Sequence, residues 1–107
     1  MEIIETFVNH QKIAELRSEK VFFTTVEEAK QLMVDLYYQG FDEIVLHEKN
    51  IIHLFFDLKT GMAGEILQTF SNFKMKLTIV GDFEKYESQS LRAFISESNK
   101  GGLINFK

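Results

Sequence analysis

One stretch of the chain sets its architecture: Phe55-Phe56-Asp57-Leu58-Lys59-Thr60-Gly61-Met62-Ala63-Gly64-Glu65-Ile66-Leu67-Gln68. An aromatic pair runs into an acidic residue, a Thr-Gly step follows, and a helical pattern then begins. Thr60 is a candidate helix cap, because threonine hydroxyls accept hydrogen bonds from first-turn amides, and Gly61 permits a tight backbone. We expect the chain to leave the core at Asp57 and to re-enter it as a helix soon after Gly61, with Thr60 accessible at the rim of a sheet.

Helices are predicted where apolar residues recur at helical spacing between cap residues. Thr25 and Glu28 form a capping box, in which the threonine accepts from a helical amide and Glu28 reaches back. Glycine residues are expected to end the first and third helices in left-handed geometry. The predicted helices run from 26 to Gly40, from about 62 to 73, and from the caps at 88–90 to Gly101-Gly102.

Strands are predicted where β-branched, aliphatic and aromatic residues cluster between turn residues. The first two form a hairpin around the turn Asn9-His10-Gln11. The segment 47–54 is expected to be a loop with a turn. The predicted strands are 3–8, 12–17, a short extended piece at 21–23, 43–46, 75–80 and 103–106.

Strands that alternate with helices indicate parallel neighbours joined by right-handed crossovers. The opening hairpin adds an antiparallel pair. We therefore predict one α/β domain over residues 1–107, with a mixed sheet of four to five strands and three main helices.

Composition excludes several classes of protein. The net charge is −4 without a basic cluster, which argues against a nucleic-acid partner and against an anionic membrane surface. The chain has no cysteine, so disulfides, thiolate metal sites and cysteine nucleophiles are absent. No export signal and no membrane-spanning run are visible, and a cytoplasmic location is expected.

Three phrases in the second half of the chain carry a family resemblance: Phe55 to Ser71, Gly81 to Phe83 and Ser90 to Gly101. They closely resemble an uncharacterised bacterial group, domain-of-unknown-function family 4180. The resemblance covers nearly the whole chain. It implies no established activity.

A weaker resemblance concerns Ile44-Val45-Leu46 and the stretch Phe55 to Gly61. This pattern is similar to the core of STAS domains, the fold of sulfate transporters and anti-sigma-factor antagonists, in which a strand leads into an Asp-Ser-Ser-Gly-like turn and a helix. The serine is a phosphorylation switch in the antagonists, and the face around it binds a partner kinase. The resemblance implies that Asp57 is the acid, Thr60 the switch hydroxyl and Gly61 the glycine.

A second candidate group consists of Asp82, Arg92 and Glu97. Asp82 follows the carboxyl end of a predicted strand, where open α/β sheets place ligand crevices. Arg92 is expected to pair with Asp82 or Asp57, as a structural ion pair or as a charge presented to a partner. The three histidines match no compact metal-binding spacing, and no metal or cofactor is expected.

The leading functional hypothesis is a non-enzymatic, STAS-like binding or regulatory module that acts on a protein partner. Its contact face would comprise the turn Asp57–Gly61, the following helix and the loop at Asp82. One alternative is a small-ligand-binding protein or small enzyme that uses the strand-end crevice near Asp57, Asp82 and Arg92. Another is a self-associating domain whose Phe-rich surface makes a homodimer.

Overall fold

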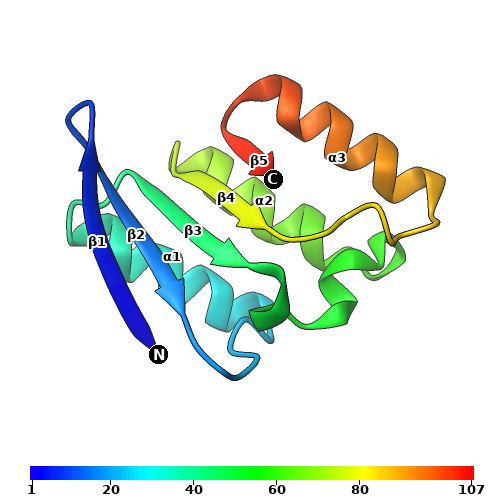
Figure 1. Cartoon of the computed structure of the whole chain (residues 1–107), viewed down its shortest axis with the longest axis horizontal. Coiled ribbons are helices and arrows are strands. Elements are labelled where there is room, and N and C mark those ends of the chain that lie inside the picture. The colour runs from blue at the N-terminus through cyan, green and yellow to red at the C-terminus, as the bar shows by residue number, and fades with distance from the viewer.

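The computed structural model describes residues 1–107 and has the predicted α/β architecture (Figure 1). Three short 3₁₀ turns join β3 to α2: η1 (Glu48–Asn50), η2 (His53–Phe56) and η3 (Leu58–Thr60). The strands are β1 (Glu2–Val8), β2 (Gln11–Arg17), β3 (Glu43–His47), β4 (Lys76–Val80) and β5 (Ile104–Phe106), and the helices are α1 (Val26–Tyr38), α2 (Met62–Asn72) and α3 (Gln89–Gly101).

The five strands form a single mixed sheet in the order β1-β2-β3-β4-β5. The β1–β2 hairpin is antiparallel, and every other pair is parallel. Its two-residue turn places both Asn9 (φ 50°) and His10 (φ 68°) in the left-handed region, which is the type I′ geometry that matches the twist of a hairpin. The prediction of a mixed sheet with three main helices is confirmed.

All three helices cover the same face of the sheet. Each crossover from β2 to β5 advances one strand in the same direction, and right-handed crossovers then place every helix on one side. In Figure 1 the strands lie in front of α1 and α2. Burial alternates along β3 and β5, whereas Thr78 of β4 is buried on the opposite face of the sheet. The buried side chains that face the helices are Ala14, Leu16, Ile44, Leu46, Leu77, Ile79, Ile104 and Phe106.

The aromatic residues belong mainly to this core. Phe23, Phe55 and Phe70 are each about 1% exposed. Phe7 is the only exposed phenylalanine, with 67% of its surface accessible. The alternative of a homodimer through a Phe-rich surface therefore has no such surface to use, because the chain itself covers the other phenylalanines.

The helix caps agree with the sequence except in one detail. Thr25 Oγ1 accepts from the Glu28 amide at 3.1 Å, and Ser88 Oγ accepts from the Leu91 amide at 3.2 Å. The Glu28 carboxylate accepts from the hydroxyl of Thr24 instead of reaching back to the Thr25 amide. Only half of the predicted capping box is formed, because the neighbouring hydroxyl offers the carboxylate a donor on the same turn.

The segment 47–54 is not a simple loop, and this expectation is wrong. His47 belongs to β3, and η1 and η2 follow it. Asn50 is 1% exposed, and its side-chain amide donates to the carbonyl oxygens of Ser18 (2.8 Å) and Lys20 (2.9 Å). This long-range clamp, together with the bridge between Phe23 and Ile51, holds the segment against the chain that precedes α1.

Candidate functional site

The turn Asp57–Gly61 lies where the sequence places it. Phe55 and Phe56 are buried, Asp57 and the residues from Lys59 to Gly61 are exposed, and Met62 is buried again. The chain therefore leaves the core and re-enters it as α2 in the expected way. Gly61 has φ 76°, a left-handed conformation that a residue with a side chain adopts only with strain.

The Thr60 hydroxyl is fully used inside this turn. Thr60 Oγ1 lies 3.0 Å from the carbonyl oxygen of Leu54 and 2.9 Å from that of Asp57, and it donates its single proton to this pair. It also accepts from the Met62 amide at 3.2 Å. This amide lies in the first turn of α2 and has no hydrogen-bond partner within the helix. The side chain is accessible. The N-cap residue of α2 is Gly61, one position after the expected Thr60, and the Thr60 hydroxyl accepts from the Met62 amide because glycine has no side chain to do so.

Asp57 has a similar local role. Its Oδ1 accepts from the Lys59 amide at 3.2 Å, as in an Asx turn. Asp57 borders an open depression of about 520 Å³ together with Ser88 and Ser90 at the start of α3. Neither Asp82 nor Arg92 borders it, so the structure separates Asp57 from the other predicted site residues.

Asp82 and Arg92 share a different depression, of about 880 Å³, between the loop after β4 and α3. The predicted ion pair of Arg92 with Asp82 or Asp57 is wrong. Arg92 instead donates to the backbone of this loop, from Nε to the Tyr86 carbonyl (2.9 Å) and from Nη2 to the Glu84 carbonyl (3.4 Å). Carbonyls left free by an irregular loop compete successfully for the guanidinium, and Arg92 thereby fixes the loop to α3.

The strand order gives little support to a ligand crevice at these strand ends. Crevices in open α/β sheets form where the strand order reverses and successive helices pass to opposite faces. The order β2-β3-β4-β5 never reverses, so the fold has no such switch point.

Glu48 anchors the same loop from the other side. Its carboxylate accepts from the Tyr86 hydroxyl, from Lys85 Nζ at 3.0 Å and from the Asp82 amide at 3.3 Å. Burial raises the pKa of the Tyr86 phenol, and the adjacent Glu48 carboxylate raises it further. A Cβ atom on Gly81 would lie 2.6 Å from Glu48 Cβ, so only glycine lets Glu48 approach the end of β4.

The face of the sheet opposite the helices has no cover and carries an ordered set of polar side chains. The strand registers place Glu15 and Arg17 of β2 beside Val45 and His47 of β3, and Glu43 opposite Lys76. Thr78 Oγ1 donates to Glu43 at 2.8 Å, and Lys76 lies 3.9 Å from the same carboxylate. The aliphatic residues between these groups are Ile4, Ile13, Val45 and Val80.

Glu15 is the centre of this uncovered face. His47 Nε2 lies 2.7 Å from Glu15 Oε2, and Arg17 Nε donates to the same oxygen at 3.0 Å. The hydrogen bond from Arg17 lowers the pKa of Glu15, and the hydrogen bond from His47 lowers it further. The carboxylate therefore stays ionised and orients the imidazole ring at the carboxyl end of β3.

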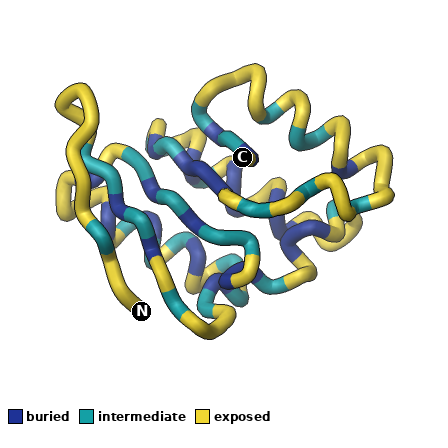
Figure 2. The backbone as a smooth tube through the Cα atoms, in the orientation of Figure 1, coloured by how far each residue is buried: buried dark blue, intermediate teal, exposed yellow.

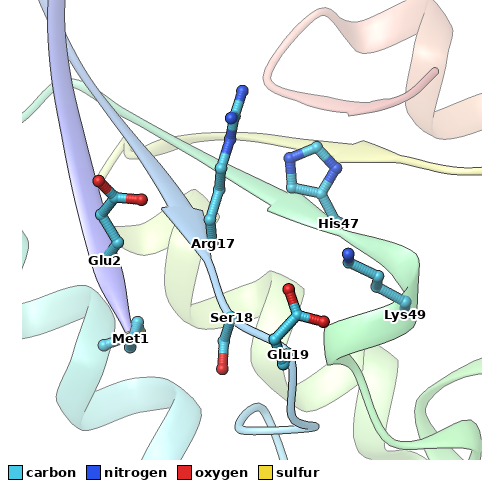
Figure 3. Close-up of a pocket in the computed structure, with 7 residues that line it drawn as sticks. All are labelled: Met1, Glu2, Arg17, Ser18, Glu19, His47 and Lys49. Atoms are coloured by element: carbon cyan, nitrogen blue, oxygen red, sulfur yellow. The ribbon is translucent and has the colours of Figure 1, made fainter.

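An open depression of about 690 Å³ adjoins this group (Figure 3). Arg17, Glu19, His47 and Lys49 surround it, and the Ser18 hydroxyl points away from the imidazole. Ser18 Oγ instead accepts from the Lys20 amide at 3.1 Å. The arrangement does not form a serine–histidine nucleophile pair, which needs those two groups within hydrogen-bond reach.

No group of three or more histidine, aspartate or glutamate side chains is placed to hold a metal ion. None of the helices combines the length and apolar character needed to cross a bilayer.

A family model described as a domain of unknown function, DUF4180, matches residues 8–107. The chain belongs to this family. The matched DUF4180 region contains every helix and the strands β2 to β5, whereas β1 precedes it except for Val8. No curated protein and no solved structure matches the chain.

Sequence reasoning missed the uncovered face of this DUF4180 domain. The signal was present only in β2, where Ala14-Glu15-Leu16-Arg17 alternates strictly between apolar and polar residues. In β3 the continuous apolar run Ile44-Val45-Leu46 indicates a strand buried on both faces that ends before His47, whereas the strand includes His47. The contact between His47 and Glu15, which are 32 positions apart, depends on the register of two strands.

Proposed function

We propose that this DUF4180 domain is a non-enzymatic binding module that contacts a protein partner through the uncovered face of its sheet. The observation that carries the proposal is the one-sided cover of β2 to β5. Parallel sheets occur almost only with both faces covered, and here all three helices lie on one side.

The chemistry of the face fits a reversible protein contact. Reversible interfaces are about as apolar as ordinary protein surface and carry about ten direct hydrogen bonds. Glu15 and Glu43 are held by neighbouring cations and hydroxyls on the same face, so they offer fixed acceptors. Val80, 36% exposed, and the half-buried Val45 supply the apolar contacts.

The absence of a deep pocket favours a protein over a small molecule. Small-molecule sites are concave and bury most of the ligand. The depression beside His47 is bordered largely by exposed charged side chains, as Figure 3 shows. A flat surface with a shallow hollow suits a loop or helix of another protein.

The regulatory part of the proposal concerns the turn Asp57–Gly61. A phosphate on Thr60 would replace the proton that its hydroxyl now donates to Leu54 and Asp57. It would add negative charge at the first turn of α2, where the helix dipole favours it. Modification would therefore rearrange the turn, and this is how a STAS-like switch would act here.

The test is a capture experiment from the native host with matched variants. Val80→Arg places a large cation on the uncovered face, and Tyr38→Arg places the same cation on α1, where Tyr38 is 77% exposed. We expect Val80→Arg to lose a partner that both Tyr38→Arg and wild type retain, with all three folded by circular dichroism. A partner kept by Val80→Arg would contradict the choice of face. Intact-mass analysis of the recovered protein shows whether Thr60 carries phosphate.

A further inference from the structure

The two edges of the sheet are built differently. At β5 the side chain of Asn99 closes the edge: its Oδ1 accepts from the Phe106 amide at 2.7 Å and its Nδ2 donates to the Phe106 carbonyl at 3.2 Å. A further strand cannot add at Phe106 without displacing this carboxamide. The edge is also short, since β5 has three residues.

At β1 nothing covers the edge. The strand has seven residues, pairs with β2 in a continuous register without a bulge, and contains neither proline nor lysine. Figure 2 shows β1 as the most exposed strand of the sheet. Natural proteins use bulges, prolines and lysines to block edge strands, because a free edge is a template for another strand.

The hairpin geometry defines which backbone groups are free. In a hairpin with a two-residue type I′ turn, the pair that flanks the turn, Val8 with Gln11, is hydrogen-bonded, and bonded pairs then alternate along the ladder. Ile3, Glu5 and Phe7 consequently direct their amide and carbonyl groups away from β2. No backbone hydrogen bond outside the hairpin involves these residues.

We propose that β1 binds β1 of a second copy of this chain in antiparallel orientation, with the two-fold axis at Ile4. The two sheets then join into one continuous sheet, with the helices of both copies on the same side. The interface is distinct from the uncovered face, so the proposal does not depend on the proposed function.

Self-pairing in this register is chemically consistent. Ile4 meets Ile4 of the second copy on the uncovered face. On the helix side, Met1 meets Phe7, and these two residues are 65% and 67% exposed in the single chain. Ile3 lies opposite Glu5 and Glu2 opposite Thr6, so no like charges are directly paired. The adjacent same-face register, centred on Glu5, would set two carboxylates against each other, which is destabilising.

The two acids of β1 do not oppose this association, because β2 supplies cations beside them. Lys12 Nζ lies 3.5 Å from Glu5 Oε1, and Arg17 is the cross-strand neighbour of Glu2. The edge strand is therefore close to neutral locally, which favours a second copy over a basic peptide.

Sedimentation equilibrium tests the association. Wild type is expected to show a concentration-dependent dimer. Glu5→Pro removes an outward amide in each copy without removing a β1–β2 hydrogen bond, and it should weaken dimerisation about thirtyfold. The control Glu5→Thr keeps the amide and should still dimerise. A wild type that stays monomeric at every concentration would overturn the proposal.

Cysteine cross-linking tests the register, and the chain has no native cysteine to interfere. Ile4→Cys should form an intermolecular disulfide under mild oxidation, because the two Cα atoms face each other across the axis at about 4.5 Å. Glu5→Cys should not, since its counterpart lies two residues further along the strand and beyond disulfide reach. Efficient cross-linking of Glu5→Cys without that of Ile4→Cys would overturn the register.

Discussion

Replacing Gly81 by alanine should destabilise the protein, because the new methyl group would occupy space taken by Glu48. The added Cβ would lie 2.6 Å from both Glu48 Cβ and Glu48 Oε1. Non-bonded carbon atoms normally approach to about 3.5–4.0 Å, so an overlap of roughly 1 Å must be relieved. Glu48 Cβ cannot simply swing away, because it is attached directly to the backbone of η1.

The magnitude follows from the two ways of relieving the overlap. Keeping Glu48 in place is an overpacked site, which costs about 1–3 kcal/mol. Moving the carboxylate gives up its charged hydrogen bonds from Tyr86 and Lys85, each of a kind worth about 1.5–3 kcal/mol when partly buried. The chain will adopt the cheaper of the two, so we expect a loss of about 2 kcal/mol.

Gly64→Ala is the matched control. Gly64 lies in α2, and a Cβ there would have no atom within 4 Å. Alanine is favoured over glycine within a helix by about 0.5–1 kcal/mol, so the same substitution should stabilise the protein here.

The assay is urea unfolding followed by far-ultraviolet circular dichroism, since the chain has no tryptophan for fluorescence. Thermal unfolding followed by the same signal should move the melting temperatures of the two variants in opposite directions, by about 4 °C per kcal/mol. In a Glu48→Gly background both colliding atoms are gone, and Gly81→Ala should then cost little. The reasoning fails if Gly81→Ala matches wild type, or if its cost is the same with and without Glu48.

Four other outcomes are expected. The pKa of Glu15 is lower in the folded state, so the folded state binds fewer protons than the unfolded state between the two pKa values. The stability that Glu15 contributes is therefore present above about pH 4.5 and is lost as the pH falls through the folded pKa. Glu15→Gln should flatten the acid limb of the curve of unfolding free energy against pH. The raised pKa of Tyr86 means that its phenol should remain protonated above about pH 10, where free tyrosine ionises. Wild type and Tyr86→Phe should therefore give the same phenolate absorbance in a spectrophotometric titration at that pH. Thr60→Val removes the hydroxyl that accepts from the Met62 amide and should cost about 1 kcal/mol in urea unfolding, whereas Thr60→Ser should retain most of that stability. His10→Gly should stabilise the hairpin by about 0.5–1 kcal/mol, because glycine adopts φ 68° without the strain of a Cβ; an unchanged unfolding midpoint would show that the turn is not strained.

The element order was predictable because its signals are local. The cap at Thr25, the αL glycines at 40 and 102 and the clusters of β-branched, aliphatic and aromatic residues in the strands act within a few residues of one another. The exit and re-entry of the chain around Thr60 was predictable for the same reason. The prediction failed at residues 47–54, where Asn50 is held by carbonyls some 30 positions away.

The candidate site depended far more on tertiary structure. Arg92 has several acids within a plausible reach in sequence, and the deciding factor is that the loop after β4 offers it unpaired carbonyls. Strand register brings His47 to Glu15, and the close approach of two backbones makes Gly81 necessary for Glu48. None of these contacts has a local signature.

Hydrophobic periodicity, turn residues and caps thus determined that this chain makes helices and strands in this order, since each depends on the conformational preferences of a few adjacent residues. The folded arrangement decided that all helices lie on one side and that one face and one edge of the sheet stay free. These properties arise from crossover handedness and strand register, which relate residues far apart in the chain and are settled only when the whole sheet is assembled.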